Sequence, residues 1–216
     1  MSTPAPALAP DQLPATTLVL ASQSPARLKT LRTAGIDPVV IVSGVDEDQL
    51  SGLSPAPLAQ ALSALKCAAV VEHPDVPVGA LVLACDSVLE LDGEPLGKPE
   101  VPEVAVARWK QMRGRSGVLH TGHTLTDTAT GRVVEATCST TVHFAADVDD
   151  DEIEAYVATG EPLWVAGAFT LEGYAAAFVT GIEGDHHNVV GVSLQTVRRM
   201  VRDLGHSWTG LWAARG

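Results

Sequence analysis

The sequence is short of positive charge. It has 14 lysine and arginine residues against 26 aspartate and glutamate residues, which gives a formal net charge of −12. A chain this acidic has no general attraction for nucleic acid or for an anionic membrane, so we expect neither as a partner. A phosphorylated small molecule can bind it only through a local basic pocket or a bridging cation.

Cysteine is also scarce. Cys67, Cys85 and Cys138 stand among apolar neighbours and form no CxxC pair. This usage favours buried free thiols in a reducing cytoplasm over a disulfide framework. The sequence has no Cys/His cluster with zinc spacing, no GxGxxG after the first apolar run, no Walker loop and no GxSxG motif, so it lacks these common signatures of metal, nucleotide and acyl-transfer sites.

Long hydrophobic runs are missing as well. No apolar stretch approaches the roughly 20 residues that a membrane-spanning helix needs. Residues 1–15 have neither the basic start nor the apolar stretch of a secretory signal, so we expect a cytoplasmic protein. Their proline and alanine content predicts a flexible arm, followed by a single domain over residues 16–216.

The remaining pattern predicts an α/β protein with a mixed central β-sheet flanked by helices, in an elongated, two-lobed domain. The expected strands are Thr17–Ala21, Pro38–Val42, Ala80–Cys85, a hairpin about Asp92–Gly93, alternating strands within 119–145, and 174–182. The expected helices are 25–34, 57–72, Val104–Arg113, Asp149–Ala158 and Ser193–Leu204.

The stretch LVLASQSPARLKTLRTAG, residues 18–35, joins a buried strand to a helix. Ser24 is the expected N-cap and Pro25 the first helical residue. The first turn of a helix attracts phosphate oxygens, and Ser22, Ser24 and Arg27 would add donors to it. The alternative is an ordinary capping serine with a solvated arginine.

Asp86 follows the apolar run Ala80–Cys85, where α/β folds keep their sites. With Asp92–Gly93 as the hairpin turn, counting back places Lys98 opposite Ser87 and beside Asp86. The ammonium would keep that carboxylate ionised or share a phosphate with its metal. The alternative is a turn acid in a plain hairpin ion pair.

Lys66 lies one turn beyond Leu62, at the edge of an apolar stripe that we place on Leu58, Leu62, Leu65 and Ala69. It either snorkels past the core or points into a cleft. The acidic turn at Asp46, Glu47 and Asp48 is either a solvated loop or a second source of oxygen ligands for Mg²⁺.

The histidines give a weaker signal. His120 and His123 are three residues apart in an expected strand, so their side chains point to opposite faces and cannot readily share a metal. His186 and His187 are expected in a loop near a rim.

Several stretches, in order, resemble the Maf-like nucleotide pyrophosphatases, which are related to the inosine-triphosphate pyrophosphatase fold. LASQSPAR is similar to the family's L-A-S-x-S-P-R-R, SGVDED to its acidic turn, and LACDSVLELDGEPLGKP to its A-D-T-V-V…G-x-x-L-x-K-P. YVATGEPLWVAGAFTLEGYAAAFV and IEGDHHNVVGVSL resemble two later blocks of the family. The likeness runs from about residue 17 to 204 and implies a cleft between the two lobes.

The resemblance implies hydrolysis of nucleoside triphosphates to the monophosphate and pyrophosphate, with Mg²⁺ or Mn²⁺ as cofactor and a homodimer as the assembly. It makes Asp86 the catalytic carboxylate and metal ligand, and Glu47 a further acidic metal ligand. It assigns the phosphates to five residues with hydroxyl or cationic side chains: Ser22, Ser24, Arg27, Lys66 and Lys98.

The chain departs from the family pattern at positions that the resemblance associates with base selection: Ala26, Ser87 and Glu172. A glutamine amide can read uracil or thymine, whereas an ionised Glu172 only accepts hydrogen bonds and suits a base with adjacent N–H donors, such as guanine. Trp164–Val165 replaces the family's D-K pair, and Gly117 stands where the family often has histidine.

The expected reaction is attack of water on the α-phosphorus, with Asp86 acting as a general base or mainly as a metal ligand. Three alternatives remain open. The chain could be a non-catalytic nucleotide-binding regulator of growth or division, or a nucleotidyl- or sugar-phosphate transferase. In the third, Asp86 and Lys98 are a structural ion pair.

Overall fold

The structure of the protein is a computed structural model that describes residues 16–46, 50 and 52–213. The expected arm over residues 1–15 lies outside the described residues, as do Glu47 and Asp48 of the acidic turn.

Within the described residues, seven strands form one twisted sheet in the order β2-β1-β3-β5-β6-β7, with β4 paired to β3. The strands are β1 Leu18–Leu20, β2 Val39–Val40, β3 Leu81–Leu91, β4 Glu94–Leu96, β5 Ser116–Asp127, β6 Val133–Phe144 and β7 Val179–Glu183. β1 pairs in parallel with β2 and β3, and the other pairs are antiparallel. The expected mixed sheet is confirmed.

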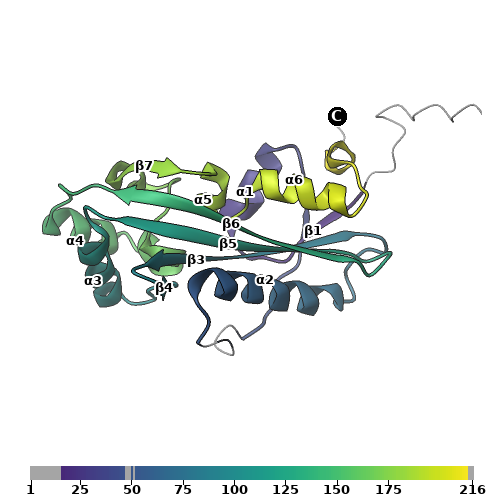
Figure 1. The fold of residues 1–216 in the computed structure, drawn as a ribbon, viewed down its shortest axis with the longest axis horizontal. Coiled ribbons are helices and arrows are strands. Elements are labelled where there is room, and N and C mark those ends of the chain that lie inside the picture. Colours follow the sequence, from purple (N-terminus) through teal and green to yellow (C-terminus); the bar gives the residue numbers. More distant parts are fainter. Residues whose placement is uncertain (1–15, 47–49, 51, 214–216) are drawn as a thin grey trace, which may run out of the picture.

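Helices cover both faces of this elongated sheet (Figure 1). The α-helices are α1 Pro25–Thr33, α2 Pro55–Val71, α3 Pro102–Met112, α4 Asp150–Ala158, α5 His186–Val190 and α6 Leu194–Asp203. Short 3-10 helices are η3 Glu161–Trp164, η4 Ala166–Ala168, η5 Tyr174–Phe178 and η6 Trp208–Leu211. α2 lies along one face, α1, α5 and α6 lie on the other, and α3 and α4 gather at one end (Figure 1).

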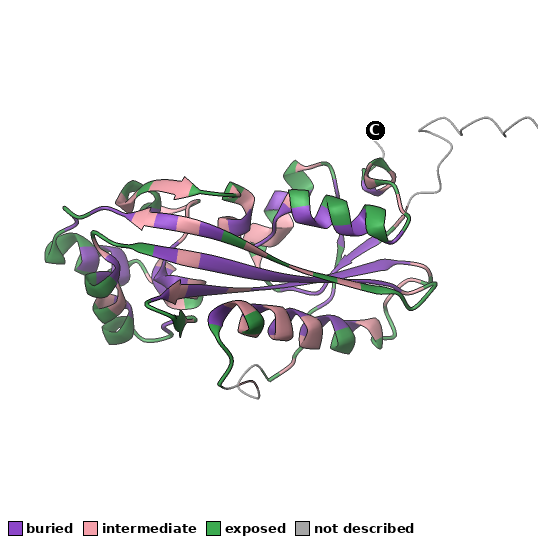
Figure 2. Ribbon diagram, viewed as in Figure 1, coloured by how far each residue is buried: buried purple, intermediate pink, exposed green. Residues whose placement is uncertain are grey.

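The alternation of side chains along β3 divides the core between the two faces. Leu81, Leu83 and Cys85 pack with α1 and α6, whereas Val82 and Ala84 pack with α2. A third cluster, rich in aromatic rings, surrounds Trp109 beneath α3 and α4. The buried residues run along the middle of β3 and β5 (Figure 2), so these strands form the rigid floor on which a site can be built.

Local signals at the helix ends are confirmed. The Ser24 side chain caps α1 by accepting a hydrogen bond from the Arg27 backbone at 3.4 Å, and Pro25 is the first helical residue. At α4, Asp149 and Glu152 form the reciprocal capping box, which fixes the first turn of that helix.

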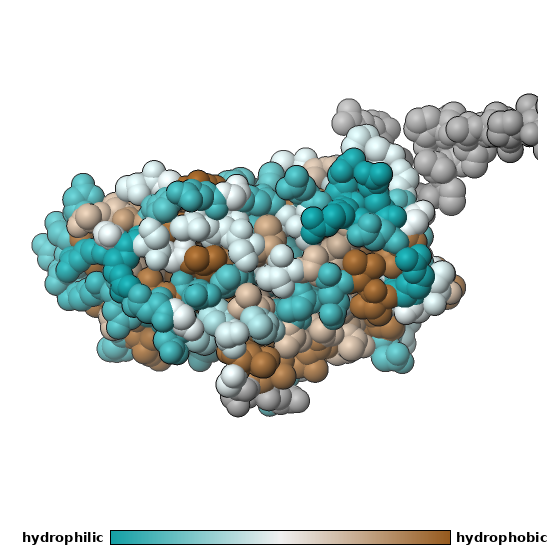
Figure 3. All heavy atoms as spheres, viewed as in Figure 1, coloured by the Kyte–Doolittle hydropathy of each residue, from teal (hydrophilic) through white to brown (hydrophobic). Residues whose placement is uncertain are grey.

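The expected inner face of α2 is confirmed at Leu62 and wrong at its other three positions. The buried residues are Pro55, Ala59, Leu62, Ser63, Lys66, Cys67 and Val70, whereas Leu58 and Leu65 are only half-buried and Ala69 is exposed. α2 is apolar nearly all round, so periodicity could not select the face, and hydrophobic residues gather over it at the surface (Figure 3). As a result, Lys66 lies within the buried face rather than at its edge.

β3 does not end before Asp86 as expected, because β5 pairs with it from Leu81 to Glu90. The hairpin turn at Asp92–Gly93 is confirmed by the pair Leu91–Glu94, but β4 ends at Leu96. Lys98 therefore has no ladder partner in β3, and Ser87 is instead paired with Thr121 of β5.

Further along the chain, the expected pair of strands within 119–145 is confirmed as β5 and β6. The expected strand 174–182 is half wrong, because Tyr174–Phe178 forms η5 and the strand begins at Val179. The expected loop at His186 and His187 is the start of α5. In the part of the chain that the structure describes, no helix is long and apolar enough to span a membrane.

Candidate active site

An open pocket of about 640 Å³ lies against one edge of β3. On this edge β1 pairs with Leu81–Leu83 and β4 with Leu89–Leu91. Among the described strands, residues 84–88 are therefore paired only with β5, on the opposite edge. The pocket fills this gap, beyond the carboxyl end of β1. Ligands bind to open α/β sheets at such places.

Asp86 and Lys66 form an ion pair in this pocket. Asp86 projects from β3 toward α2, where the Lys66 ammonium donates a hydrogen bond to its Oδ1. Both side chains are 11% exposed. A carboxylate can accept more than one hydrogen bond. Asp86 can therefore bind a cation, or accept a hydrogen bond from a water molecule, while it stays paired with Lys66.

The close approach of α2 to the sheet makes this pair possible. Gly122 of β5 is the ladder partner of Asp86. A Cβ atom on Gly122 would lie 2.3 Å from the Ala59 carbonyl oxygen and 2.5 Å from Gln60 Cα, both in the backbone of α2. The helix therefore packs directly on the strand backbone, which brings Lys66 within reach of Asp86.

The start of α1 supplies the opposite wall. Arg27 donates from Nε to the Gly191 carbonyl at 2.7 Å, from one terminal nitrogen to Ser22 Oγ at 3.2 Å, and from the other to Ser87 Oγ at 3.1 Å. Ser22 Oγ also accepts from the Ser24 backbone N–H at 3.1 Å. The guanidinium is thus held in one orientation next to the helix N-terminus.

The side chains of Asp86 and Ser87 lie on different faces of the sheet, because consecutive strand residues point in opposite directions. Asp86 meets Lys66 from α2, and Ser87 meets Arg27 from α1. The pocket thereby brings the Asp86 carboxylate together with the cations Lys66 and Arg27, from three elements far apart in the sequence.

The structure places most of the predicted site residues on the walls of this pocket. Those that line it are Ser22, Ser24, Ala26, Arg27, Lys66, Asp86, Ser87 and Lys98. Lys98 is exposed. Glu172 lies outside the pocket, where its carboxylate pairs with Lys29 at 3.0 Å beside a smaller hollow. Glu47 lies outside the described residues.

Sequence reasoning missed the apolar wall of the pocket and the backbone that holds Arg27. Leu119, Trp164, Val165, Phe169 and Val190 line the wall. Of these, Trp164 is 66% exposed at the rim. The carbonyl of Gly191 carries no signal in a sequence, although the block IEGDHHNVVGVSL around it resembles the family.

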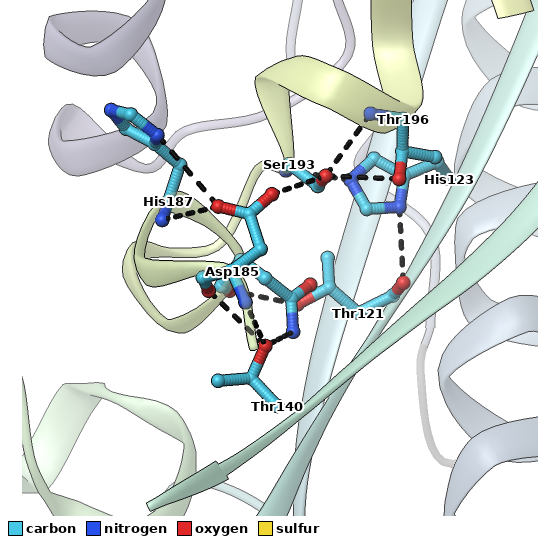
Figure 4. A network of polar contacts seen from close by, with 8 residues as sticks. Thr121, His123, Thr140, Asp185, His187, Ser193 and Thr196 are labelled. Atoms are coloured by element: carbon cyan, nitrogen blue, oxygen red, sulfur yellow. Dashed lines mark hydrogen bonds and ion pairs between the residues drawn. The ribbon is translucent and has the colours of Figure 1, made fainter. Parts of the chain in front are cut away.

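A buried polar network ties α5 and its flanking residues to β5 and β6 (Figure 4). Asp185 caps α5, and Ser193 Oγ donates to its carboxylate at 2.6 Å. Asn188 is fully buried and donates to the Leu119 carbonyl and to Thr140 Oγ1, both at 3.1 Å. This segment carries Gly191, so the network fixes the carbonyl to which Arg27 binds.

His123 belongs to the same network. Its Nε2 accepts from the Ser193 backbone N–H at 2.9 Å, which leaves Nδ1 to donate to the Thr121 carbonyl at 3.0 Å. Burial, with a smaller effect of the positive Arg27, lowers the pKa of His123 to about 4. The imidazole is therefore neutral at physiological pH and serves as a structural bridge.

Burial also raises the pKa of the Cys85 thiol to about 12.

The donor set of the pocket fits a divalent cation that prefers oxygen ligands. Within the described residues, Asp86 is the one carboxylate that lines the pocket, and no cluster of three or more His, Cys, Asp or Glu could hold a metal unaided. Mg²⁺ is usually held by one or two carboxylates together with substrate phosphates. One carboxylate beside a basic wall suits Mg²⁺ or Mn²⁺ bound with a phosphorylated ligand, and does not suit zinc.

Comparison with known proteins gives the relationship of the chain. The family model described as Maf-like protein matches residues 17–204. The chain is 61% identical to the nucleoside triphosphate pyrophosphatase of Streptomyces avermitilis, over 92% of this chain and 95% of that protein. It is 60% identical to the protein of the same name from Streptomyces coelicolor, over 91% and 94%. A relative of that name from Gloeothece citriformis is 48% identical, over 90% and 97%.

Among solved structures, the Staphylococcus aureus Ham1 protein matches with a TM-score of 0.49 and 14% identity, over 88% of this chain and 100% of that one. The family match covers most of the sequence, and the three relatives share about half or more of their residues with it over nearly their full length. The predicted relationship is confirmed: the chain belongs to the Maf-like family.

Proposed function

We propose that this protein is a nucleoside triphosphate pyrophosphatase, a hydrolase that converts a nucleoside triphosphate to the monophosphate and pyrophosphate. The observation that carries this proposal is a single pocket lined both by Asp86 and by the cationic start of α1, in a chain that is otherwise strongly acidic. The names of relatives up to 61% identical support the same activity.

The basic wall would bind the triphosphate. Ser22 and Ser24 offer hydroxyl and backbone groups at the N-terminus of α1, where the helix dipole favours anions. Arg27 adds a planar donor, and Lys66 and Lys98 add point charges from two other sides of the pocket. These groups would offset the charge that gathers on the departing pyrophosphate.

The chemical step would be attack of a water oxygen on the α-phosphorus. The bond from that phosphorus to the bridging oxygen breaks, and pyrophosphate leaves with the electron pair. Asp86 would orient the water and accept its proton, or mainly ligate the metal. Asp86 and Glu47 would hold Mg²⁺ or Mn²⁺, which when bound would neutralise phosphate charge and lower the pKa of a bound water.

The preferred base stays a separate proposal. Glu172 suits a guanine-type base by its acceptor chemistry, and modified or non-standard nucleotides fall within the same proposal. In this structure, however, the Glu172 carboxylate pairs with Lys29 outside the pocket. Faster hydrolysis of UTP or dTTP than of GTP, across a panel of nucleotides, would remove the guanine preference.

The decisive experiment is a turnover screen of ordinary and modified nucleoside triphosphates with Mg²⁺, Mn²⁺ or no added metal. We expect equal amounts of monophosphate and pyrophosphate, with water as the only acceptor. Binding without turnover would favour the non-catalytic regulator of growth or division. Dependence on an added acceptor would favour a transferase.

Two expectations about the cellular form also remain proposals. A homodimer is implied by the family resemblance, and sedimentation of the purified protein would test it. A cytoplasmic location is supported by the free cysteines, of which Cys67 and Cys85 are buried and Cys138 is partly exposed.

A further inference from the structure

Ser87 occupies a position that the family resemblance associates with base selection, but its hydroxyl already makes hydrogen bonds within the protein. Ser87 Oγ accepts from Arg27 at 3.1 Å and lies 2.9 Å from Thr121 Oγ1. Thr121 Oγ1 in turn donates to the Asn188 carbonyl at 3.1 Å. We call the chain from Ser87 through Thr121 to this carbonyl the hydroxyl relay.

The chemistry of its two ends fixes the direction of every hydrogen in the relay. A guanidinium only donates and a carbonyl only accepts. Thr121 has one hydroxyl hydrogen, which goes to the Asn188 carbonyl. Ser87 must therefore donate its own hydrogen to Thr121 and accept from Arg27. No donor remains on Ser87 for a nucleobase.

The relay ends on the segment that holds Arg27 from the other side. The Asn188 side chain fastens α5 to β5 and β6, and three residues later the Gly191 carbonyl accepts from Arg27 Nε at 2.7 Å. α5 and its C-cap residue thus hold the guanidinium at two points, directly through Gly191 and indirectly through the relay.

This clamp leaves useful donors on Arg27. A guanidinium has five N–H groups, and the hydrogen bonds to Gly191, Ser22 and Ser87 use three of them. One N–H remains on each terminal nitrogen. Arg27 therefore keeps two charged donors for the oxygens of a phosphate.

We propose that Thr121 and Ser87 are positioning residues that orient Arg27 toward the phosphates, and that Ser87 acts on the reaction through Arg27 rather than by reading the base. This inference rests on the proposed function, because it assigns Arg27 to the triphosphate. It extends to Thr121, which is fully buried and does not line the pocket, so its side chain can influence a bound ligand only through other residues.

Thr121→Val tests the relay because it removes the hydroxyl while keeping the shape of the side chain. We expect kcat/KM to fall about tenfold or more for every nucleotide, with the ratios between bases unchanged. Calorimetry with inorganic tripolyphosphate, which has no base, should show a similar loss of affinity. Thr121→Ser, which restores the hydroxyl, should recover both.

The matched control is Thr126→Val, on the same strand. Thr126 is also buried, and its hydroxyl contacts Cys67 on the α2 side, away from the relay. We expect Thr126→Val to lower the Tm without changing tripolyphosphate affinity. If Thr121→Val does not fold, Ser87→Ala makes the same test, since Ser87 is only half-buried.

The outcomes separate the relay from base reading. The proposal fails if Ser87→Ala or Thr121→Val changes the ratio between bases while tripolyphosphate affinity stays at the wild-type value. It also fails if the wild-type protein hydrolyses nucleotides but does not bind tripolyphosphate. A wild-type protein that binds tripolyphosphate and releases no pyrophosphate would overturn the proposed activity and leave the relay measurable by calorimetry.

Discussion

The ammonium of Lys66 in α2 is paired with the carboxylate of Asp86 in β3, and both line the pocket. Both residues are buried, but each contributes to the wall of the pocket. Both side chains are 11% exposed, so Asp86 is held beside a cation while it stays accessible to a ligand in the pocket. It makes Asp86 the first residue to test.

Asp86→Asn should fold and lose most of its turnover. Asparagine can still accept a hydrogen bond from Lys66, so the fold is kept, but it has no negative charge to take a proton or bind a cation. Pyrophosphate release should fall between about 100- and 10,000-fold. Asp92→Asn in the exposed hairpin turn is the control and should keep its activity. Near-normal turnover of Asp86→Asn would refute its catalytic role.

Arg27→Lys should reduce kcat/KM about 10- to 100-fold, although it keeps the charge. Lysine has no planar fork, so it cannot bind Gly191, Ser22 and Ser87 together and still offer two donors to a phosphate. Arg32→Lys is the control, because Arg32 lies in the last turn of the same helix and pairs with Asp37 at the surface. Equal kinetics for the two variants would contradict the clamped geometry.

Gly122→Ala should destabilise the protein by about 1–3 kcal/mol or more. The added methyl group would meet the α2 backbone at 2.3 Å, so the helix has to move and carry Lys66 away from Asp86. Thermal unfolding should show the lower Tm, and pyrophosphate release a lower rate. Gly97→Ala has open space around the new Cβ and serves as control. An unchanged Tm for Gly122→Ala would show that α2 does not pack as described.

Stability should fall on acidification because of His123. The pKa of about 4 in the folded chain lies below the ordinary 6.5. The unfolded chain then binds more protons as the pH drops below about 6.5, and the folded state loses about 3 kcal/mol by pH 4 relative to pH 7.

The measurement is urea unfolding at several pH values, for the wild type and for His123→Gln. Glutamine can accept from Ser193 and does not titrate, so the variant should show a shallower loss of stability between pH 6.5 and 4. The carboxylates titrate equally in both proteins and cancel in the difference. The same slope in both would mean that His123 does not titrate in this range.

The parts of the fold that were predicted from sequence depend on residues close together in the chain. Ser24 and Pro25 start α1, and Asp92–Gly93 makes the hairpin turn, because caps and two-residue turns are decided within a few residues. The position of Asp86 at an accessible edge was predicted correctly, although for the wrong reason. β3 continues through it, and the edge is open because β1 stops short.

What escaped prediction depends on contacts between distant segments. Arg27 and Gly191 are 164 residues apart, and Thr121 and Asn188 are 67 apart. The hydrophobic periodicity of a strand does not show which hydroxyl groups, such as that of Thr121, bond to a distant segment. α5 is only five residues long, too short for a helical pattern. The inner face of α2 escaped prediction for a local reason. A helix that is apolar nearly all round has no contrast between an apolar and a polar face, so its sequence does not show which face is buried.

Two cations of the pocket stand on opposite sides of the sheet, Arg27 in the layer of α1 and Lys66 in the layer of α2. A polyphosphate that touches both would fasten the two outer layers to each other through the gap at β3. Ligand at 100 times its Kd contributes about 2.7 kcal/mol to the folded state. Amide hydrogens in α1 and in α2 would then exchange more slowly together, as one cooperative unit, although the helices share no face.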